Sequence, residues 1–383
     1  ARRKVIAMRS RGGHLTSFYH DLAQRILDLG GIHNAHLHLD RVETLSGDVW
    51  KKAKLDPGAA ATASLVDKHA LIPALHNGPA YSVESLRRRV NDCLDTMVAV
   101  NTRRADTFVD VTADRVGLTA IKVLHEIKRE RTNEIDLRLG AYSPLGYTEA
   151  EPERWDLLIE GAQHSDFIGS LPEADDRREH SDGIGFFEHL MRFLLLGQQL
   201  GKEVHLHLDQ RNEPSENGTE QLVDAIREVG APVSKSGEPM VWAIHVVSPS
   251  TYDEKRFGRL LDGMVEENIG VICCPSAALG MRQLRPINTP TFNSIARVLE
   301  MLAAGLTVRL GNDNMADICS PSTTADLIDE IFILSAALRF YHIPTLARLA
   351  AGQQLSDAER RHVVGHLERD KHETDRMIGK LRK

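Results

Sequence analysis

The chain has 383 residues, 42% of them hydrophobic, so it is long enough for one large domain or two ordinary ones with a sizeable core. Its formal net charge of −7 gives no reason to expect a nucleic-acid partner. It has no apolar run long enough to span a bilayer and no signal peptide near its start, and its four cysteines lack zinc-ribbon spacing, so we expect a protein of the reducing cytoplasm without a membrane partner.

The first predicted element is a helix over residues 17–29, which a glycine pair ends. A short apolar strand follows and carries His36 and His38. Alternate side chains of a strand lie on the same face, so these two imidazoles are expected to lie together. Residues 41–80 have turn signals on both sides of an alanine-rich piece and are expected to form a lid-like excursion, with disorder or plain packing as the alternative.

Helices and strands then alternate along the chain. After a predicted helix over 82–104, strands are predicted at 107–112, 135–142, 166–171, 203–209, 240–247, 269–274 and 306–311. The helices after them are predicted at 115–130, 151–163, 185–200, 216–229, 251–266 and 292–304, and from 323 onward. With the first strand this makes eight, which favours an α/β fold with a closed (β/α)8 TIM barrel. The alternative is a doubly wound open sheet, although no Gly-x-Gly-x-x-Gly turn follows the first strand.

The end of the chain is highly charged and is predicted to be helical, beginning at a capping box formed by Ser356 and Glu359. Its few apolar positions fit packing either on a second subunit, in a homo-oligomer, or on the barrel. We therefore divide the chain into an N-terminal arm and helix (1–31), a barrel that includes the excursion (32–350) and a charged C-terminal helical tail (351–383).

Residues that bind metal ions in other proteins end or follow four of the predicted strands. These residues are His36 and His38 on the first strand, His207 on the fifth, His245 on the sixth and Asp313 after the eighth. The carboxyl ends of barrel strands meet at one rim, where active sites lie. A lone histidine is usually structural, but metal-binding side chains at the same end of four strands indicate a metal site.

This order of residues resembles the amidohydrolase superfamily, and most closely its cytosine deaminase branch. The resemblance covers about residues 30–350 and rests on the runs 36–40, 108–111, 204–209, 243–245 and 305–314. It implies a barrel of the metal-dependent hydrolase type. Many relatives add a small β-sandwich, which we expect to be absent here because only about thirty residues precede the first strand and the C-terminus is predicted to be helical.

The resemblance also implies roles for the residues at the rim. His36, His38, His207 and Asp313 would hold one divalent metal ion, Zn²⁺ or Fe²⁺. The metal lowers the pKa of water, so that hydroxide becomes available near neutral pH. Asp313 would also take the proton of the water, and His245 would orient the hydroxide or polarise the attacked carbon.

The chain departs from the branch at three positions near this rim. Where the branch has a proton-shuttling glutamate after the histidine of strand five, this chain has Gln210, whose amide does not exchange a proton. Either Asp209 or Glu213 replaces that acid, or the reaction needs none, or residue 210 was altered to trap a complex. The chain also has Asn314 where the branch often has a second aspartate, and Phe108 where it tends to have a histidine.

We therefore expect a mononuclear metal-dependent hydrolase that cleaves a C–N bond of a small molecule. Deamination of an amino-heterocycle is the first expectation. The alternatives are hydrolysis of an exocyclic or cyclic amide, and a non-catalytic binding protein whose barrel has lost its enzymatic activity. Gln210 is a candidate catalytic and substrate-binding residue, and Asn314 and Glu173 are further candidates for contact with the substrate.

Overall fold

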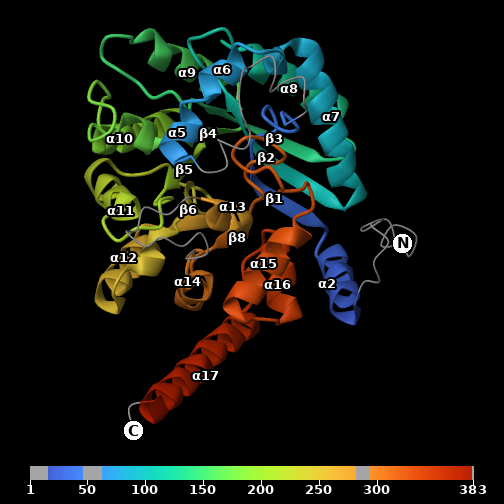
Figure 1. Ribbon diagram of the computed structural model, residues 1–383, viewed down its shortest axis with the longest axis vertical. Coiled ribbons are helices and arrows are strands. Elements are labelled where there is room, and N and C mark those ends of the chain that lie inside the picture. The colour runs from blue at the N-terminus through green and yellow to red at the C-terminus, as the bar shows by residue number, and fades with distance from the viewer. Residues whose placement is uncertain (1–15, 46–62, 282–293, 382–383) are drawn as a thin grey trace.

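The computed structural model describes residues 16–45, 63–281 and 294–381 (Figure 1). Eight parallel strands lie in one sheet in the order of the sequence, and a parallel bridge between Leu37 and Asp313 nearly closes that sheet into a barrel. The predicted (β/α)8 fold is therefore confirmed, and the described residues form no second sheet. The strands are β1 (Ile32–Leu37), β2 (Thr102–Asp110), β3 (Asp136–Tyr142), β4 (Phe167–Ser170), β5 (Glu203–Leu208), β6 (Val241–His245), β7 (Ile269–Cys273) and β8 (Val308–Leu310).

Helices surround the strands on the outside of the barrel (Figure 1). They connect successive strands, as right-handed β–α–β units require. The helices that follow the strands are α7 (Val83–Ala99), α8 (Thr119–Glu130), α9 (Glu153–Gln163), α10 (Phe186–Leu200), α11 (Gly218–Val229), α12 (Glu254–Glu266), α13 (Pro275–Gly280), α14 (Val298–Ala304), α15 (Ile328–Leu338) and α16 (Ile343–Ala350).

The strands bury both of their faces, which is why they appear in the sequence as short apolar runs. Alternate residues fill the inside of the barrel, where Trp242 and Ile244 of β6 pack with Phe108 and Phe167. The intervening residues face the helices and form a larger apolar layer with them. This packed interior leaves only the carboxyl ends of the strands for a site.

The boundary between α7 and β2 differs from the prediction. The predicted helix over 82–104 is too long, because α7 ends at Ala99 and β2 begins at Thr102. Asn101 between them has a φ of +70°, a left-handed conformation that ends a helix. At the start of β2, Arg104 forms an ion pair with Asp106 at 2.9 Å. These charged residues interrupt the apolar pattern, so the sequence did not predict the start of the strand.

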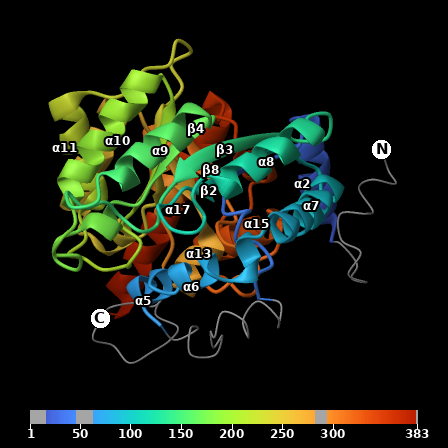
Figure 2. The same ribbon diagram turned by 90° about the horizontal axis from the view of Figure 1, so that it is seen from above.

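The excursion contains short helices rather than an open loop in its described part. These are α5 (Leu65–His69), α6 (Ile72–His76) and the 3₁₀ turn η1 (Pro79–Tyr81). A capping box of Ser64 and Asp67 starts α5. Helices α5 and α6 follow one another along one edge of the barrel (Figure 2). The first of the two predicted turn signals, at residues 56–58 before the alanine-rich piece, lies outside the described residues.

The chain ends in the helix α17 (Asp357–Leu381), which extends away from the barrel in Figure 1. The predicted capping box is confirmed, because Glu359 accepts from Ser356 N at 2.8 Å. Val363 of α17 is fully buried, whereas Met377 further along is 53% exposed. At the other end of the chain, α2 (Ser17–Asp28) lies beside α16. None of the described helices is both long and apolar enough to cross a membrane.

Candidate metal centre and active site

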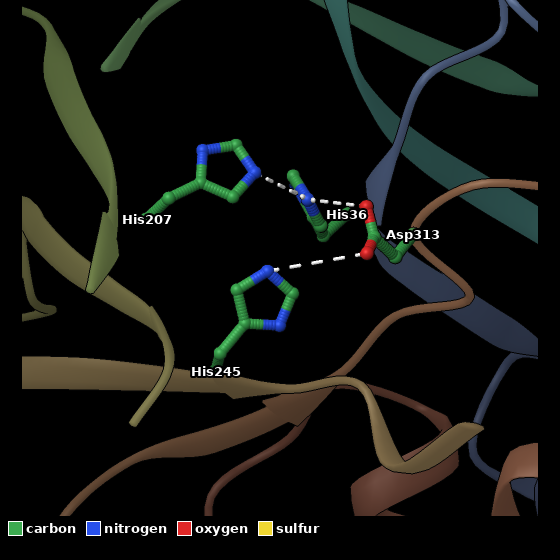
Figure 3. A group of neighbouring side chains, drawn as sticks. All are labelled: His36, His207, His245 and Asp313. Atoms are coloured by element: carbon green, nitrogen blue, oxygen red, sulfur yellow. Dashed lines mark hydrogen bonds and ion pairs between the residues drawn. The ribbon is translucent and has the colours of Figure 1, made fainter. Parts of the chain in front are cut away.

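Four buried side chains converge at the mouth of the barrel (Figure 3). They are His36, His207, His245 and Asp313, and their nitrogen and oxygen ligand atoms all lie within 4.8 Å of one another. His38 lies beside them, with its Nε2 3.4 Å from Asp313 Oδ1. The structure thus brings together all five side chains that the sequence placed at this rim.

Asp313 contacts histidines from two strands. Its Oδ1 is 3.2 Å from His36 Nε2, and its Oδ2 is 3.9 Å from His245 Nε2. His36 Nε2 also lies 3.2 Å from His207 Nε2. Nitrogen and oxygen atoms from three strands and one loop are therefore directed at one small volume, as in a metal site.

The backbone fixes Asp313 against β1. Asp313 N donates to His36 O at 2.9 Å. Gly311 lies two residues earlier, and a Cβ atom there would lie 2.7 Å from His36 Cβ and 2.8 Å from His36 O. Only glycine allows the end of β8 to approach β1 this closely.

Left-handed backbone conformations occur where two of these segments leave the barrel. His245, Val246 and Asp313 have φ values of +76°, +49° and +60°. Such conformations are rare for residues other than glycine, above all for a β-branched residue, and each costs on the order of 1–3 kcal/mol. The rest of the barrel holds this strained backbone in place, and strain of this kind gathers at functional sites.

Burial favours the neutral form of three histidines at this site, namely His38, His207 and His245. It lowers the pKa of His38 and of His245 to about 4, and it lowers the pKa of His207 well below the usual value. Burial acts to raise the pKa of Asp313, but hydrogen bonds from His36 and His38 outweigh it and hold that pKa well below the usual range. Neutral imidazoles around an ionised carboxylate are the protonation states in which these side chains bind a metal ion.

The donor atoms fit a divalent metal ion. Both ring nitrogens of His245 are buried without a hydrogen-bond partner among the described residues, which is costly unless a ligand satisfies one of them. His207 Nδ1 lies 3.0 Å from the carbonyl oxygen of Ser170, and this contact directs Nε2 toward the centre. Imidazole nitrogens with one carboxylate oxygen suit zinc or ferrous iron.

Strand β2 contributes an apolar floor beneath the cluster instead of a ligand. The ring centroid of Phe108 lies 4.9 Å from that of His36 and 5.1 Å from that of His207. Tyr142 stacks on Phe108 with centroids 4.8 Å apart. Both aromatic side chains are buried, so the cluster packs against rings on this side.

A cavity lies over the cluster and opens between the strand ends and the excursion. His38, His207, Gln210, Asp313 and Asn314 line it, together with four residues that we did not predict, namely Arg41, Lys68, His69 and Tyr142. Tyr142 is the last residue of β3, and this position at a strand end could have predicted that it lines the site. Lys68 and His69 carry no such signal because they lie on α5, in the excursion.

A buried polar network attaches the excursion to the barrel beside this cavity. Arg41 Nε donates to Asp110 Oδ2 at 3.0 Å, and Arg41 Nη2 lies 2.5 Å from Oδ1. Tyr81 of η1 donates to the same carboxylate at 2.5 Å, and His76 Nε2 of α6 lies 3.0 Å from it. The end of β2 therefore holds both the cavity-lining Arg41 and the excursion.

Neither of the two acids suggested to replace the missing glutamate lines the cavity. The predicted strand over 203–209 is one residue too long, because β5 ends at Leu208 and Asp209 has a φ of +56°. Its carboxylate instead accepts from the backbone and hydroxyl of Thr219, at 2.9 and 2.5 Å, and thus caps α11. The side chain of Glu213 accepts a hydrogen bond from Ser215.

The remaining candidates lie at the edge of the cavity. Gln210 lines it, and Gln210 Nε2 donates to Glu173 Oε2. Glu173 belongs to the 3₁₀ turn η2 (Pro172–Asp175) after β4 and is buried behind Gln210. Asn314 also lines the cavity, and its amide donates to Asp317 at 2.5 Å.

No protein-family model matches the chain. An uncharacterized protein from Haemophilus influenzae is 27% identical over 292 residues, which are 76% of this chain and 96% of that protein. A pterin deaminase from Rhizobium rhizogenes is 20% identical over 312 residues, and the match spans 80% of this chain but only 64% of the length of that enzyme.

Solved structures share the fold of this chain. The 5-methylcytosine deaminase of Klebsiella pneumoniae has a TM-score of 0.66 at 21% identity, covering 82% of this chain and 69% of that one. The N-isopropylammelide isopropylaminohydrolase of Burkholderia multivorans has a TM-score of 0.62 at 18% identity, covering 88% and 82%. The atrazine chlorohydrolase of Arthrobacter aurescens, complexed with zinc, has a TM-score of 0.52 at 12% identity, covering 84% and 71%. The resemblance to cytosine deaminase-like barrels is thus confirmed for the fold.

Proposed function

We propose that this protein is a metal-dependent hydrolase that cleaves a C–N bond and releases ammonia from an amino-substituted heterocycle. The observation that carries this proposal is the buried cluster of histidines around the carboxylate of Asp313 at the barrel mouth. Relatives in sequence and in fold support it, since they include a pterin deaminase and a 5-methylcytosine deaminase.

Three residues of the cluster, His36, His207 and Asp313, would hold one divalent metal ion together with the neighbouring His38. When bound, the ion supplies the Lewis acidity that makes a water molecule nucleophilic near neutral pH. Asp313 is ionised at that pH and takes a proton from the attacking water. Neutral His245, at the same cluster, orients that water toward the substrate.

The cavity lining suits a flat, polar substrate. Tyr142 offers an aromatic surface, and the amides of Gln210 and Asn314 offer both donors and acceptors for the edge of a heterocycle. Arg41 and Lys68 add positive charge to the same lining. A heterocycle with carbonyl or anionic groups opposite its amino group matches this set of side chains.

Product analysis tests the proposal. Metal-loaded protein is incubated with a panel of aminopyrimidines, aminotriazines and pterins, and with a panel of amides. We expect ammonia from at least one amino-heterocycle. If only the amides react, and release an amine and a carboxylate, the activity would be amide hydrolysis and not deamination. No product from either panel, with full metal content, would contradict the enzyme function and favour a binding protein.

A further inference from the structure

The proposed deamination needs a second acid, and the described residues that line the cavity do not include one. Deamination of a C=N–containing ring requires a proton at the ring nitrogen while water attacks the carbon. Among the described residues that line the cavity, Asp313 is the only carboxylate, and it already accepts the proton of the water. Gln210 occupies the edge of the cavity where an acid is expected, but its amide does not exchange a proton.

A carboxyl group lies directly behind that amide. Gln210 Nε2 donates to Glu173 Oε2, so the turn after β4 supplies a carboxyl to the edge formed by β5. Glu173 is only 8% exposed. Its Oε1 is buried and has no hydrogen-bond partner among the described residues. A buried carboxyl oxygen without a partner is costly unless a ligand or a proton satisfies it.

The surroundings of Glu173 keep a proton on it. Burial raises the pKa of Glu173 well above its usual value, and the carboxylates of Glu216 and Asp209 raise it further, against the opposing effects of Arg211 and Gln210. The guanidinium of Arg211 is committed elsewhere, since its Nη2 donates to Glu179 at 2.8 Å. A neutral carboxyl with one free oxygen is suited to donate a proton.

We propose that Glu173 is the acid that exchanges a proton with the ring nitrogen of the substrate, and that Gln210, which lines the cavity, holds the Glu173 carboxyl beside it. This inference rests on the proposed deamination. The acid of this pair then lies on the turn η2 that follows β4, and the amide lies in the segment that follows β5.

The proton transfers balance over one turnover. Asp313 takes one proton from water as the new C–O bond forms, and the π electrons of the C=N bond move to the ring nitrogen, which takes the proton of Glu173. Asp313 then gives its proton to the amino group, and the C–N bond breaks to release ammonia. The carbonyl forms as the new hydroxyl returns its proton to Glu173, which restores both carboxyl groups.

Exchange of the two residues tests the inference. We expect Glu173→Gln to lower kcat for ammonia release by about a hundredfold or more, with the metal content unchanged. The double variant Glu173→Gln/Gln210→Glu keeps one carboxyl and one amide at the same place, so we expect it to regain most of the lost rate. Glu216→Gln is the matched control, because it removes a neighbouring acid that does not contact Gln210 in the structure. It should keep kcat and move the alkaline limb of the pH profile to lower pH.

The infrared spectrum gives a readout that does not need turnover. The difference spectrum between the wild type and Glu173→Gln near neutral pH should show a carboxylic-acid carbonyl band of Glu173, because the bands of other buried acids such as Glu216 and Glu330 are common to both proteins. Ammonia release by the wild type together with a near-wild-type kcat in Glu173→Gln would overturn this inference and leave the proposed function intact. A double variant as slow as Glu173→Gln, with full metal content, would also contradict it. A metal-loaded wild type that releases no ammonia would instead overturn the proposed function.

Discussion

Asp313 joins the two halves of the candidate site. It contacts His36 and His38 of the first strand segment at 3.2 and 3.4 Å and His245 of β6 at 3.9 Å. In the proposed mechanism it acts as both metal ligand and base. One side chain would then link the binding of the metal to the chemistry, through its charge more than its shape.

The isosteric change Asp313→Asn tests this double role. It keeps the volume of the side chain but removes the charge that balances a cation. We expect metal content to fall sharply and ammonia release to fall by about 10²–10⁴-fold. Metal analysis and rate measurement on the same sample check this, with Asp262→Asn on the exposed side of α12 as the control. Full metal content with wild-type rate would show that this carboxylate has neither role.

Gly311 is the residue that lets Asp313 reach the cluster. In Gly311→Ala the added methyl group would meet His36 at 2.7–2.9 Å, so the end of β8 must move away from β1. We expect a loss of about 1–3 kcal/mol in the free energy of unfolding, together with weaker metal binding. Denaturant unfolding with and without metal measures both effects.

Gly258→Ala in α12 is the matched control for this substitution. A Cβ atom at residue 258 would meet no atom within 4 Å. We expect this helical change to leave stability unchanged or raise it by up to about 1 kcal/mol. A Gly311→Ala variant as stable as Gly258→Ala would show that the close approach of β8 to β1 is not required.

At the scale of elements, the excursion is attached to the barrel through a charged histidine of α6. His76 lies between Asp110 and Asp114, with its ring nitrogens 3.0 and 2.6 Å from their carboxylates. Burial acts to lower the pKa of His76, but these two hydrogen bonds outweigh it and raise the pKa to about 9. The protonated ring is therefore the form that holds α6 against β2.

This predicts a specific dependence of stability on pH. Because the pKa of His76 in the folded chain lies above the usual value of 6.5, its contribution is complete below about pH 6.5 and is lost as the pH rises through about 9. The stability difference between the wild type and His76→Gln should shrink over that range by on the order of 2–3 kcal/mol. Unfolding curves of both proteins from pH 6 to about pH 10 measure it. A difference that stays constant with pH would contradict the charged state of His76.

The order of the elements could be predicted from the sequence because parallel strands are buried on both faces and appear as apolar runs. The start of β2 could not, since Arg104 and Asp106 pair with each other there and break the apolar pattern. The short helices α5 and α6 were also missed. Their positions depend on contacts with β2 that are distant in sequence, such as that of His76 with Asp110.

At the scale of the whole molecule, the candidate metal ligands were predictable and the proposed acid was not. His36, His207 and Asp313 each lie at a strand end, and the barrel topology alone brings strand ends together. Glu173 was named only as a loop residue that contacts the substrate. Its contact with Gln210 depends on how the turn η2 directs one side chain behind another, which no spacing in the sequence reports.

The molecule as a whole is expected to work only with metal at the barrel mouth, because the ligand atoms of three histidines and one carboxylate lie within one small volume. Chelation should leave the barrel folded, since its apolar core is independent of the cluster. Circular dichroism before and after chelation checks that the fold is retained.

Metal reconstitution of the chelated protein tests the central claim most directly. Zinc or ferrous iron is added in steps, and bound metal and ammonia release are measured on each sample. We expect the rate to rise in proportion to bound metal and to level off at about one ion per chain, as a single catalytic site requires. Full activity in the chelated protein, or a well-folded chain that binds no metal, would contradict the claim.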